Sequence, residues 1–71
     1  MDQPITYRGR EFRLDNAGAR FLMERAVEKH EANEETMARR LVSLAVRTEA
    51  GLCTSGEALD AAAPYLCAGR C

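Results

Sequence analysis

The sequence predicts a mostly helical α+β fold, in which an N-terminal β-hairpin packs on a small bundle of two longer helices and one short C-terminal helix. Two observations lead to this class. Residues 5–14 alternate apolar and polar side chains on either side of a dipeptide that ends in glycine. After them, apolar side chains recur at helical spacing in segments that begin with capping residues. A chain of 71 residues is expected to form a single domain over 1–71.

The first predicted element is the β-hairpin over residues 5–14. Arg8 and Gly9 are expected to form its two-residue loop, because glycine supplies the positive φ that a tight turn needs. This loop sets a register in which the facing pairs are Ile5 with Phe12, Thr6 with Glu11, and Tyr7 with Arg10. One face is then apolar and needs a cover, since an isolated hairpin is marginally stable in water. Its members are Ile5, Tyr7, Phe12 and Leu14.

The first helix is predicted over residues 16–31, with Asp15 or Asn16 as its N-cap. At about 100° per residue, one face is apolar and ends in the chain's one histidine. That face consists of Ala19, Leu22, Met23, Ala26, Val27 and His30. The opposite face is charged, yet Phe21 falls on it, which marks Phe21 as a contact residue.

The second helix is predicted over residues 34–50, with Asn33 as its cap and Gly51 as its stop. Its apolar side chains span about 200° of the helical wheel, wider than the stripe of about 100° on a typical surface helix. One neighbour cannot cover such an arc. The helix is therefore expected to lie between two partners, either the two other helices or the first helix and a second subunit. The apolar residues are Met37, Ala38, Leu41, Val42, Leu44, Ala45 and Val46.

The third helix is predicted over residues 55–66. Thr54 and Glu57 have the spacing of a capping box, in which each side chain bonds the other residue's backbone N–H. The helix is expected to break near Pro64, because proline lacks an amide donor and disfavours helix at the residue before it.

Composition favours a cytoplasmic protein. The N-terminus has no apolar core of a secretory signal, and no stretch approaches the roughly 18 apolar residues of a membrane span. The net charge of -1 argues against a strongly basic nucleic-acid-binding domain. Three cysteines in this compartment are expected to be thiols or metal ligands rather than disulfides.

The chain carries no local motif of a hydrolase, nucleotide-binding enzyme or zinc protease, so it is predicted not to be an enzyme and to need no cofactor. Zinc is the alternative. Cys53, Cys67, Cys71 and His30 have the number and chemical types of a Cys₃His site. A metal site is not favoured, because no pair has the tight C-x₂-C spacing and Gly69 would weaken the helix that Cys67 and Cys71 need.

Arginines form two clusters that are predicted to bind a partner. Arg39, Arg40 and Arg47 lie on the polar side of the second helix with no acid among them, and Arg8, Arg10 and Arg13 lie on the hairpin. Arginine binds carboxylate or phosphate through two parallel hydrogen bonds. Pairing with the chain's own glutamates is the simpler interpretation. The functional one is contact with an acidic protein surface, with Phe21 as an additional contact residue.

The stretch Glu11–Thr48 loosely resembles the ribbon-helix-helix DNA-binding proteins. Phe12-Arg13-Leu14 would be the strand, followed by two helices joined near Ala32-Asn33. In that family two chains pair their strands and polar strand residues read the major groove, so the resemblance implies DNA contact through Arg13, with Arg10 or Glu11 beside it. The hairpin partner Ile5–Gly9 and the C-terminal cysteines have no counterpart in the family.

These observations favour a small non-enzymatic protein that acts by binding another protein with an acidic surface, as an inhibitor, adaptor or regulator, and that forms a homodimer. Phage and mobile-element accessory proteins, including anti-defence inhibitors, are often built in this way. A DNA-binding regulator is the first alternative and a zinc-stapled small domain is the second. No membrane partner is expected.

Overall fold

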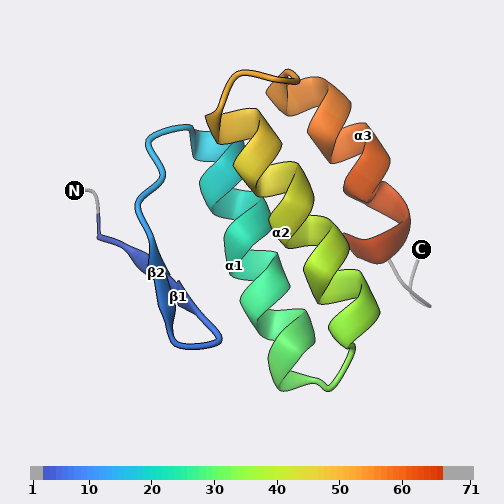
Figure 1. Ribbon diagram of the computed structural model, residues 1–71. Helices are drawn as coiled ribbons and strands as arrows, with labels where there is room; N and C mark the ends of the chain where they lie inside the picture. Colours follow the sequence, from blue (N-terminus) through green and yellow to red (C-terminus); the bar gives the residue numbers. More distant parts are fainter. Residues whose placement is uncertain (1–2, 67–71) are drawn as a thin grey trace.

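The computed structural model describes residues 3–66 and confirms the predicted fold class. A two-stranded antiparallel sheet, β1 (Ile5–Tyr7) and β2 (Arg10–Phe12), precedes three helices, α1 (Ala17–Glu31), α2 (Glu35–Glu49) and α3 (Ser55–Leu66). In the view of Figure 1, α1 runs down, α2 runs up and α3 runs down, with α2 between the other two helices and the hairpin beside α1. Most of the wide apolar arc of α2 is thus covered within one chain, by α1 and α3, while Val46 is 44% exposed and Leu44 is half-buried.

The hairpin has the predicted register, with Ile5 opposite Phe12 and Tyr7 opposite Arg10. Arg8 and Gly9 both have positive φ, 53° and 81°, as a type I′ turn requires. Ile5, Tyr7 and Leu14 are buried and Phe12 is half-buried against the helical core. The apolar face of the hairpin is therefore covered by the bundle of its own chain.

The core is built from a few large side chains and many alanines. Leu22, Met23 and Leu41 are its largest fully buried side chains. Six buried alanines lie between the helices and allow them to approach closely: Ala19, Ala26, Ala38, Ala45, Ala58 and Ala62. None of the helices within residues 3–66 has the length and hydropathy that a membrane span requires.

The junction between α1 and α2 differs from the prediction that Asn33 caps α2. Asn33 has a φ of 65°, its N–H donates to the carbonyl of His30 at 3.0 Å, and the N–H of Glu34 donates to that of Lys29 at 2.8 Å. These bonds are a Schellman motif, so Asn33 ends α1 and makes no cap for α2. Glu34 occupies the N-cap position of α2 without a side-chain cap bond. Because the connection between α1 and α2 is short, its residue with a positive φ, Asn33, terminates α1 and does not cap α2.

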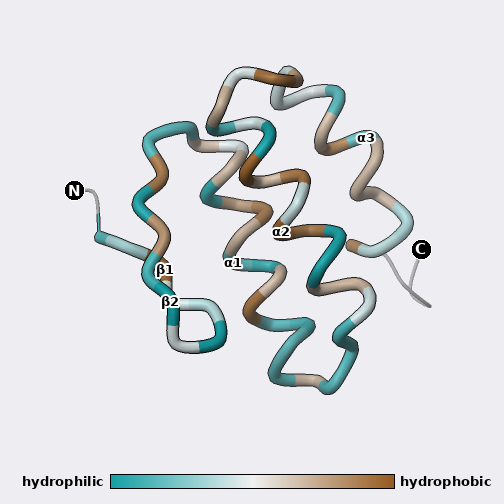
Figure 2. The backbone as a smooth tube through the Cα atoms, in the orientation of Figure 1, coloured by the Kyte–Doolittle hydropathy of each residue, from teal (hydrophilic) through white to brown (hydrophobic). Residues whose placement is uncertain are grey.

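Gly51 stops α2 as expected. It has a φ of 82°, its N–H donates to the carbonyl of Thr48 at 3.1 Å, and the N–H of Leu52 donates to that of Arg47 at 2.9 Å. This is a second Schellman motif. It turns the chain so that Leu52 stands 76% exposed. In Figure 2 the loop between α2 and α3 accordingly includes a strongly hydrophobic stretch, whereas the loop between α1 and α2 is mostly hydrophilic.

The capping box of α3 forms as predicted. Thr54 Oγ1 accepts from the N–H of Glu57 at 3.1 Å, and Glu57 Oε1 accepts from the N–H of Thr54 at 3.0 Å. The predicted break near Pro64 is wrong, because α3 continues to Leu66 with Pro64 inside it. Pro64 is exposed and lies in the last turn, where its missing N–H leaves unbonded only a carbonyl that water can reach.

The starts of α1 and α3 are joined at one end of the bundle. Asn16 caps α1, since its Oδ1 accepts from the N–H of Ala19 at 3.1 Å, and the same oxygen accepts from Ser55 Oγ at 3.1 Å. Glu49, the last residue of α2, accepts from the N–H groups of Asp15 and Asn16 at 3.0 and 2.9 Å. These backbone bonds hold the pKa of Glu49 below its ordinary value.

Candidate partner-binding groove between α2 and α3

A groove runs between α2 and α3 near the loop that joins them. Its larger part has a volume of about 630 Å³ and is lined by Leu44, Arg47, Leu52, Cys53, Glu57, Ala58 and Ala61. A smaller part of about 230 Å³ shares Leu44, Arg47 and Ala61 and adds Arg40, Ser43 and Tyr65. Because the two parts share three lining residues, they form one continuous surface, called here the α2–α3 groove.

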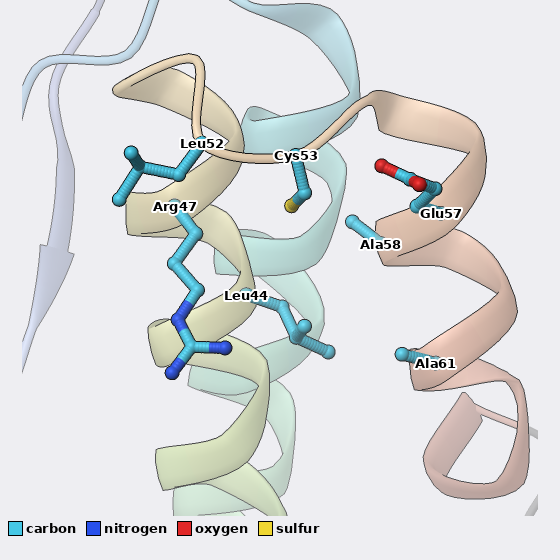
Figure 3. A pocket seen from close by; sticks show the side chains of 7 residues that line it. All are labelled: Leu44, Arg47, Leu52, Cys53, Glu57, Ala58 and Ala61. Atoms are coloured by element: carbon cyan, nitrogen blue, oxygen red, sulfur yellow. The ribbon is translucent and has the colours of Figure 1, made fainter.

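The groove has an apolar floor and charged rims of opposite sign. In Figure 3, Leu44 points from α2 toward α3, and Ala58 and Ala61 face it from α3. Arg47 stands on the α2 side and Glu57 on the α3 side. Glu57 is held there by its bond in the capping box. The α2 rim is therefore cationic and the α3 rim anionic.

The predicted arginines of α2 do not form one cluster. Arg40 and Arg47 are seven residues apart, about two helical turns, so both lie on the side of α2 that faces the groove. Arg39 is about 100° away around the helix and lines no part of the groove. All three are exposed, and none of them forms an ion pair with a carboxylate in the described part of the chain.

Tyr65 helps to position Arg40. The guanidinium carbon of Arg40 lies 5.9 Å from the centre of the Tyr65 ring, within the range of a cation–π contact. This contact holds the charge at the edge of the groove and leaves its N–H donors available. Tyr65 and the loop residue Leu52 were missed by the sequence interpretation, because both become groove residues only when α3 packs beside α2.

The hairpin arginines lie elsewhere. Arg8 Nη1 is 3.4 Å from Glu35 Oε2, so one positive charge of this cluster is paired within the chain. The Arg10 guanidinium carbon lies 5.7 Å from the centre of the Phe12 ring, and Arg13 is exposed after β2. Figure 1 shows the hairpin on the α1 side of the bundle, away from α3. The two basic clusters therefore do not make one surface.

Phe21 is exposed on α1, as its place on the charged face predicted. It is 40% exposed, and the Arg25 guanidinium carbon lies 5.3 Å from its ring centre. Phe21 does not line the α2–α3 groove.

His30 takes part in a cluster that the sequence did not reveal. Glu35 accepts hydrogen bonds from His30 Nδ1, from the Tyr7 hydroxyl at 3.2 Å and from Arg8 at 3.4 Å. The rings of Tyr7 and His30 meet edge to face with centres 5.4 Å apart. The cluster joins the hairpin to the end of α1 and the start of α2, so this histidine has a structural partner.

The alternative of a Cys₃His zinc site would need His30 and Cys53 to bind one ion, but the structure places them at opposite ends of α2. His30 lies near the start of α2 and Cys53 follows its end. The two are separated by a helix of 15 residues, about 22 Å long, whereas ligands of one zinc ion lie within about 2.3 Å of it. His30 and Cys53 therefore cannot bind the same ion. Cys67 and Cys71 lie outside the described residues, and residues 3–66 contain no group of three or more metal-binding side chains.

The structure differs from the ribbon-helix-helix arrangement in the way its strands pair. In that arrangement the strand of one chain pairs with the strand of a second chain, but β2 here pairs with β1 of its own chain. Arg13 falls after β2 ends at Phe12. The strand residue that the resemblance implies for base reading is thus outside the ribbon.

No family model, curated protein or solved structure matches this chain.

The Glu35 cluster should make the stability of the fold depend on pH in the acidic range. The hydrogen bond from His30, followed by that from Tyr7 and by the charges of His30 and Arg8, holds the pKa of Glu35 below its ordinary value of 4.5, although partial desolvation opposes them. A carboxyl whose pKa is lower in the folded state stabilises the fold above its unfolded pKa. That contribution is lost as the pH falls from about 4.5 through the lower folded pKa.

We expect Glu35→Gln to flatten the decline of the melting temperature between about pH 5 and pH 3, a window set by the ordinary pKa of 4.5 and the lower pKa in the folded state. Thermal unfolding followed by circular dichroism in this range measures the effect. Glu24→Gln is the matched control, because the exposed Glu24 makes no side-chain hydrogen bond or ion pair within residues 3–66. Parallel curves for wild type and Glu35→Gln would show that the cluster does not form in solution.

Proposed function

We infer that this chain is a cytoplasmic, non-enzymatic protein that acts by binding another protein, and that the α2–α3 groove is its principal binding surface. One observation supports this most strongly: an apolar floor lies next to two arginines that have no acidic partner in the described residues. Interfaces combine a desolvated apolar centre with charged residues at the rim, and arginine is enriched in them. An inhibitor, adaptor or regulator with an acidic partner fits this arrangement.

Self-association is a second part of the proposal. The apolar arc of α2 gives it little support, because α1 and α3 cover most of that arc, leaving Val46 44% exposed and Leu44 half-buried on the floor of the groove. Phe21 is the feature that supports it, since this side chain is 40% exposed on a charged helix face and aromatic residues are enriched in interfaces. A homodimer through Phe21 would leave the α2–α3 groove open to the partner.

Site-specific photo-crosslinking tests both parts. Benzoylphenylalanine in place of Leu52, which is 76% exposed at the end of the groove, should give a discrete protein adduct in cells that encode this chain. The same group in place of Ala63, which is exposed on α3 but lines no part of the groove, is the matched control. In place of Phe21 it should give an adduct of twice the chain mass.

Mass spectrometry identifies what is attached. Equal labelling from positions 52 and 63 would refute the groove as the binding surface. An adduct at position 52 that nuclease removes would favour the DNA-binding alternative. No dimer adduct from position 21 at high protein concentration would remove the homodimer from the proposal.

A further inference from the structure

The proposed function leaves the form of the partner open, and the shape and charge of the α2–α3 groove restrict it. We propose that the groove binds an amphipathic α-helix whose apolar side chains lie on the floor and whose carboxylates lie over Arg40 and Arg47. This proposal rests on the proposed function, since it specifies the occupant of the same surface.

The walls of the groove favour a helix over an extended peptide. Both walls are helices, so their backbone N–H and C=O groups bond within α2 and α3. An extended peptide gains affinity mainly by adding a strand to a free sheet edge, and no such edge is present here. A helix satisfies its own backbone groups and contributes only side chains. It is therefore the form of peptide that this surface can bind without leaving buried polar groups unpaired.

The spacing of the contacts matches two turns of a partner helix. Arg40 and Arg47 are seven residues apart, which is about 10.5 Å along α2. Apolar residues at positions i, i+3 or i+4, and i+7 of a partner helix cover the same length. Small side chains at Ala58 and Ala61 leave room for that helix to approach, and Leu52, 76% exposed, supplies an apolar contact at the end of the floor.

The charges decide which side of the partner is acidic. The α2 rim carries Arg40 and Arg47, which lack carboxylate partners in the region that the structure covers. The α3 rim carries the exposed carboxylate of Glu57. A partner helix should then have acids on the flank over α2 and neutral or basic side chains on the flank over α3.

The same polarity argues against nucleic acid in the groove. A phosphate backbone carries negative charge all along its length and is bound by surfaces of one sign. Here it would lie against Glu57 on one side, and its charged groups would face the apolar floor formed by Leu44 and the two alanines. An acidic amphipathic helix avoids both the repulsion from Glu57 and the placing of charged groups against the apolar floor.

Selection from a phage-displayed library of helix-biased peptides tests the proposal. The library is selected in parallel on wild type, on Ala61→Phe, which fills the floor, and on Ala63→Phe, which adds the same ring to α3 outside the groove. Clones from wild type should retain binding to Ala63→Phe and lose at least about tenfold on Ala61→Phe, as expected for blocking the centre of an interface. Their sequences should show apolar residues at helical spacing and an excess of Asp and Glu on one flank.

Charge reversal on α2 gives a second readout with purified peptides. Arg40→Glu with Arg47→Glu should weaken the selected peptides by at least about tenfold, mainly through slower association. Arg39→Glu, the matched control outside the groove, should weaken them by less than about threefold. Circular dichroism confirms that each variant keeps the helical spectrum of the wild type.

The outcomes separate this proposal from the proposed function. Groove-dependent clones without an acidic flank, or an absence of groove-dependent clones, overturn the acidic helix. If benzoylphenylalanine at position 52 still captures a protein, the proposed function survives that result. Tight binding of a fluorescent DNA duplex of random sequence that the arginine double variant abolishes would overturn both in favour of nucleic acid.

Discussion

Leu41→Ala should lower the free energy of unfolding by about 2–5 kcal/mol, the range for truncating a fully buried leucine. Leu41 is completely buried on the face of α2 that packs into the core. A core of this size contributes only about 3–5 kcal/mol to net stability, so we expect the variant to be largely unfolded at 37 °C. Urea denaturation followed by circular dichroism at 222 nm measures the change.

Leu52→Ala is the matched control, because the same substitution is made at a leucine that is 76% exposed. It should change stability by no more than about 0.5 kcal/mol. Should Leu41→Ala be too unstable to measure, Leu41→Val gives a smaller loss in the same direction. Equal stability of the two alanine variants would mean that α2 does not pack as described.

Gly18→Ala should destabilise the protein by about 1–3 kcal/mol, the usual cost of forcing an extra methyl into a packed site. Alanine is ordinarily the better helix former, by about 1 kcal/mol. At this position, however, a Cβ would lie 2.7 Å from Ser55 Oγ and 2.8 Å from Ser55 Cβ. Since Ser55 begins α3, relief requires the two helices to separate.

Gly56→Ala is the control, and it should change the stability in the opposite direction. It lies in the first turn of α3, and its added methyl would meet only Thr54 Oγ1, at 4.0 Å. We expect it to raise stability by up to about 1 kcal/mol. Ser55→Gly should partly rescue Gly18→Ala by removing the atoms in the way. A neutral or stabilising Gly18→Ala would indicate that α1 and α3 are farther apart than the structure places them.

Local patterns predicted most of the secondary structure. The register of the hairpin follows from Arg8 and Gly9 at its turn, and the start of α3 from Thr54 and Glu57, three residues apart. Both depend on residues that are neighbours in the sequence. Pro64 was misread because its effect depends on its distance from the helix end and on exposure, which the sequence does not give.

The groove could be predicted only in part. The acid-free face of α2 drew attention to Arg40 and Arg47, but the same reasoning included Arg39, which the packing of α3 leaves outside. Tyr65 and Leu52 could not be assigned, because their roles arise from contacts between α2, its following loop and α3. Residues that act through tertiary contact carry no periodic signal of their own.

The role of Glu35 could not be predicted for the same reason, because it too depends on tertiary contacts. Its two neighbours in the cluster from the hairpin, Tyr7 and Arg8, precede it by 28 and 27 residues. In the sequence it looks like an ordinary acidic residue in the first turn of a helix, where the helix dipole favours it. Three donors converge on it only after the hairpin folds back on the bundle.

The junction at Asn16 has a consequence for synthesis on the ribosome. The acceptor for the N–H groups of Asp15 and Asn16 is Glu49, 34 and 33 residues later, and the donor to the Asn16 side chain is Ser55, 39 residues later. A nascent chain that ends before Glu49 therefore has the local cap of α1, from the N–H of Ala19 to Asn16, but lacks the acceptor for the two N–H groups that precede the helix. Pairing over such separations is slow compared with helix formation. The first helix should therefore form early, whereas its start becomes anchored to the rest of the bundle only after α2 and the beginning of α3 have left the exit tunnel.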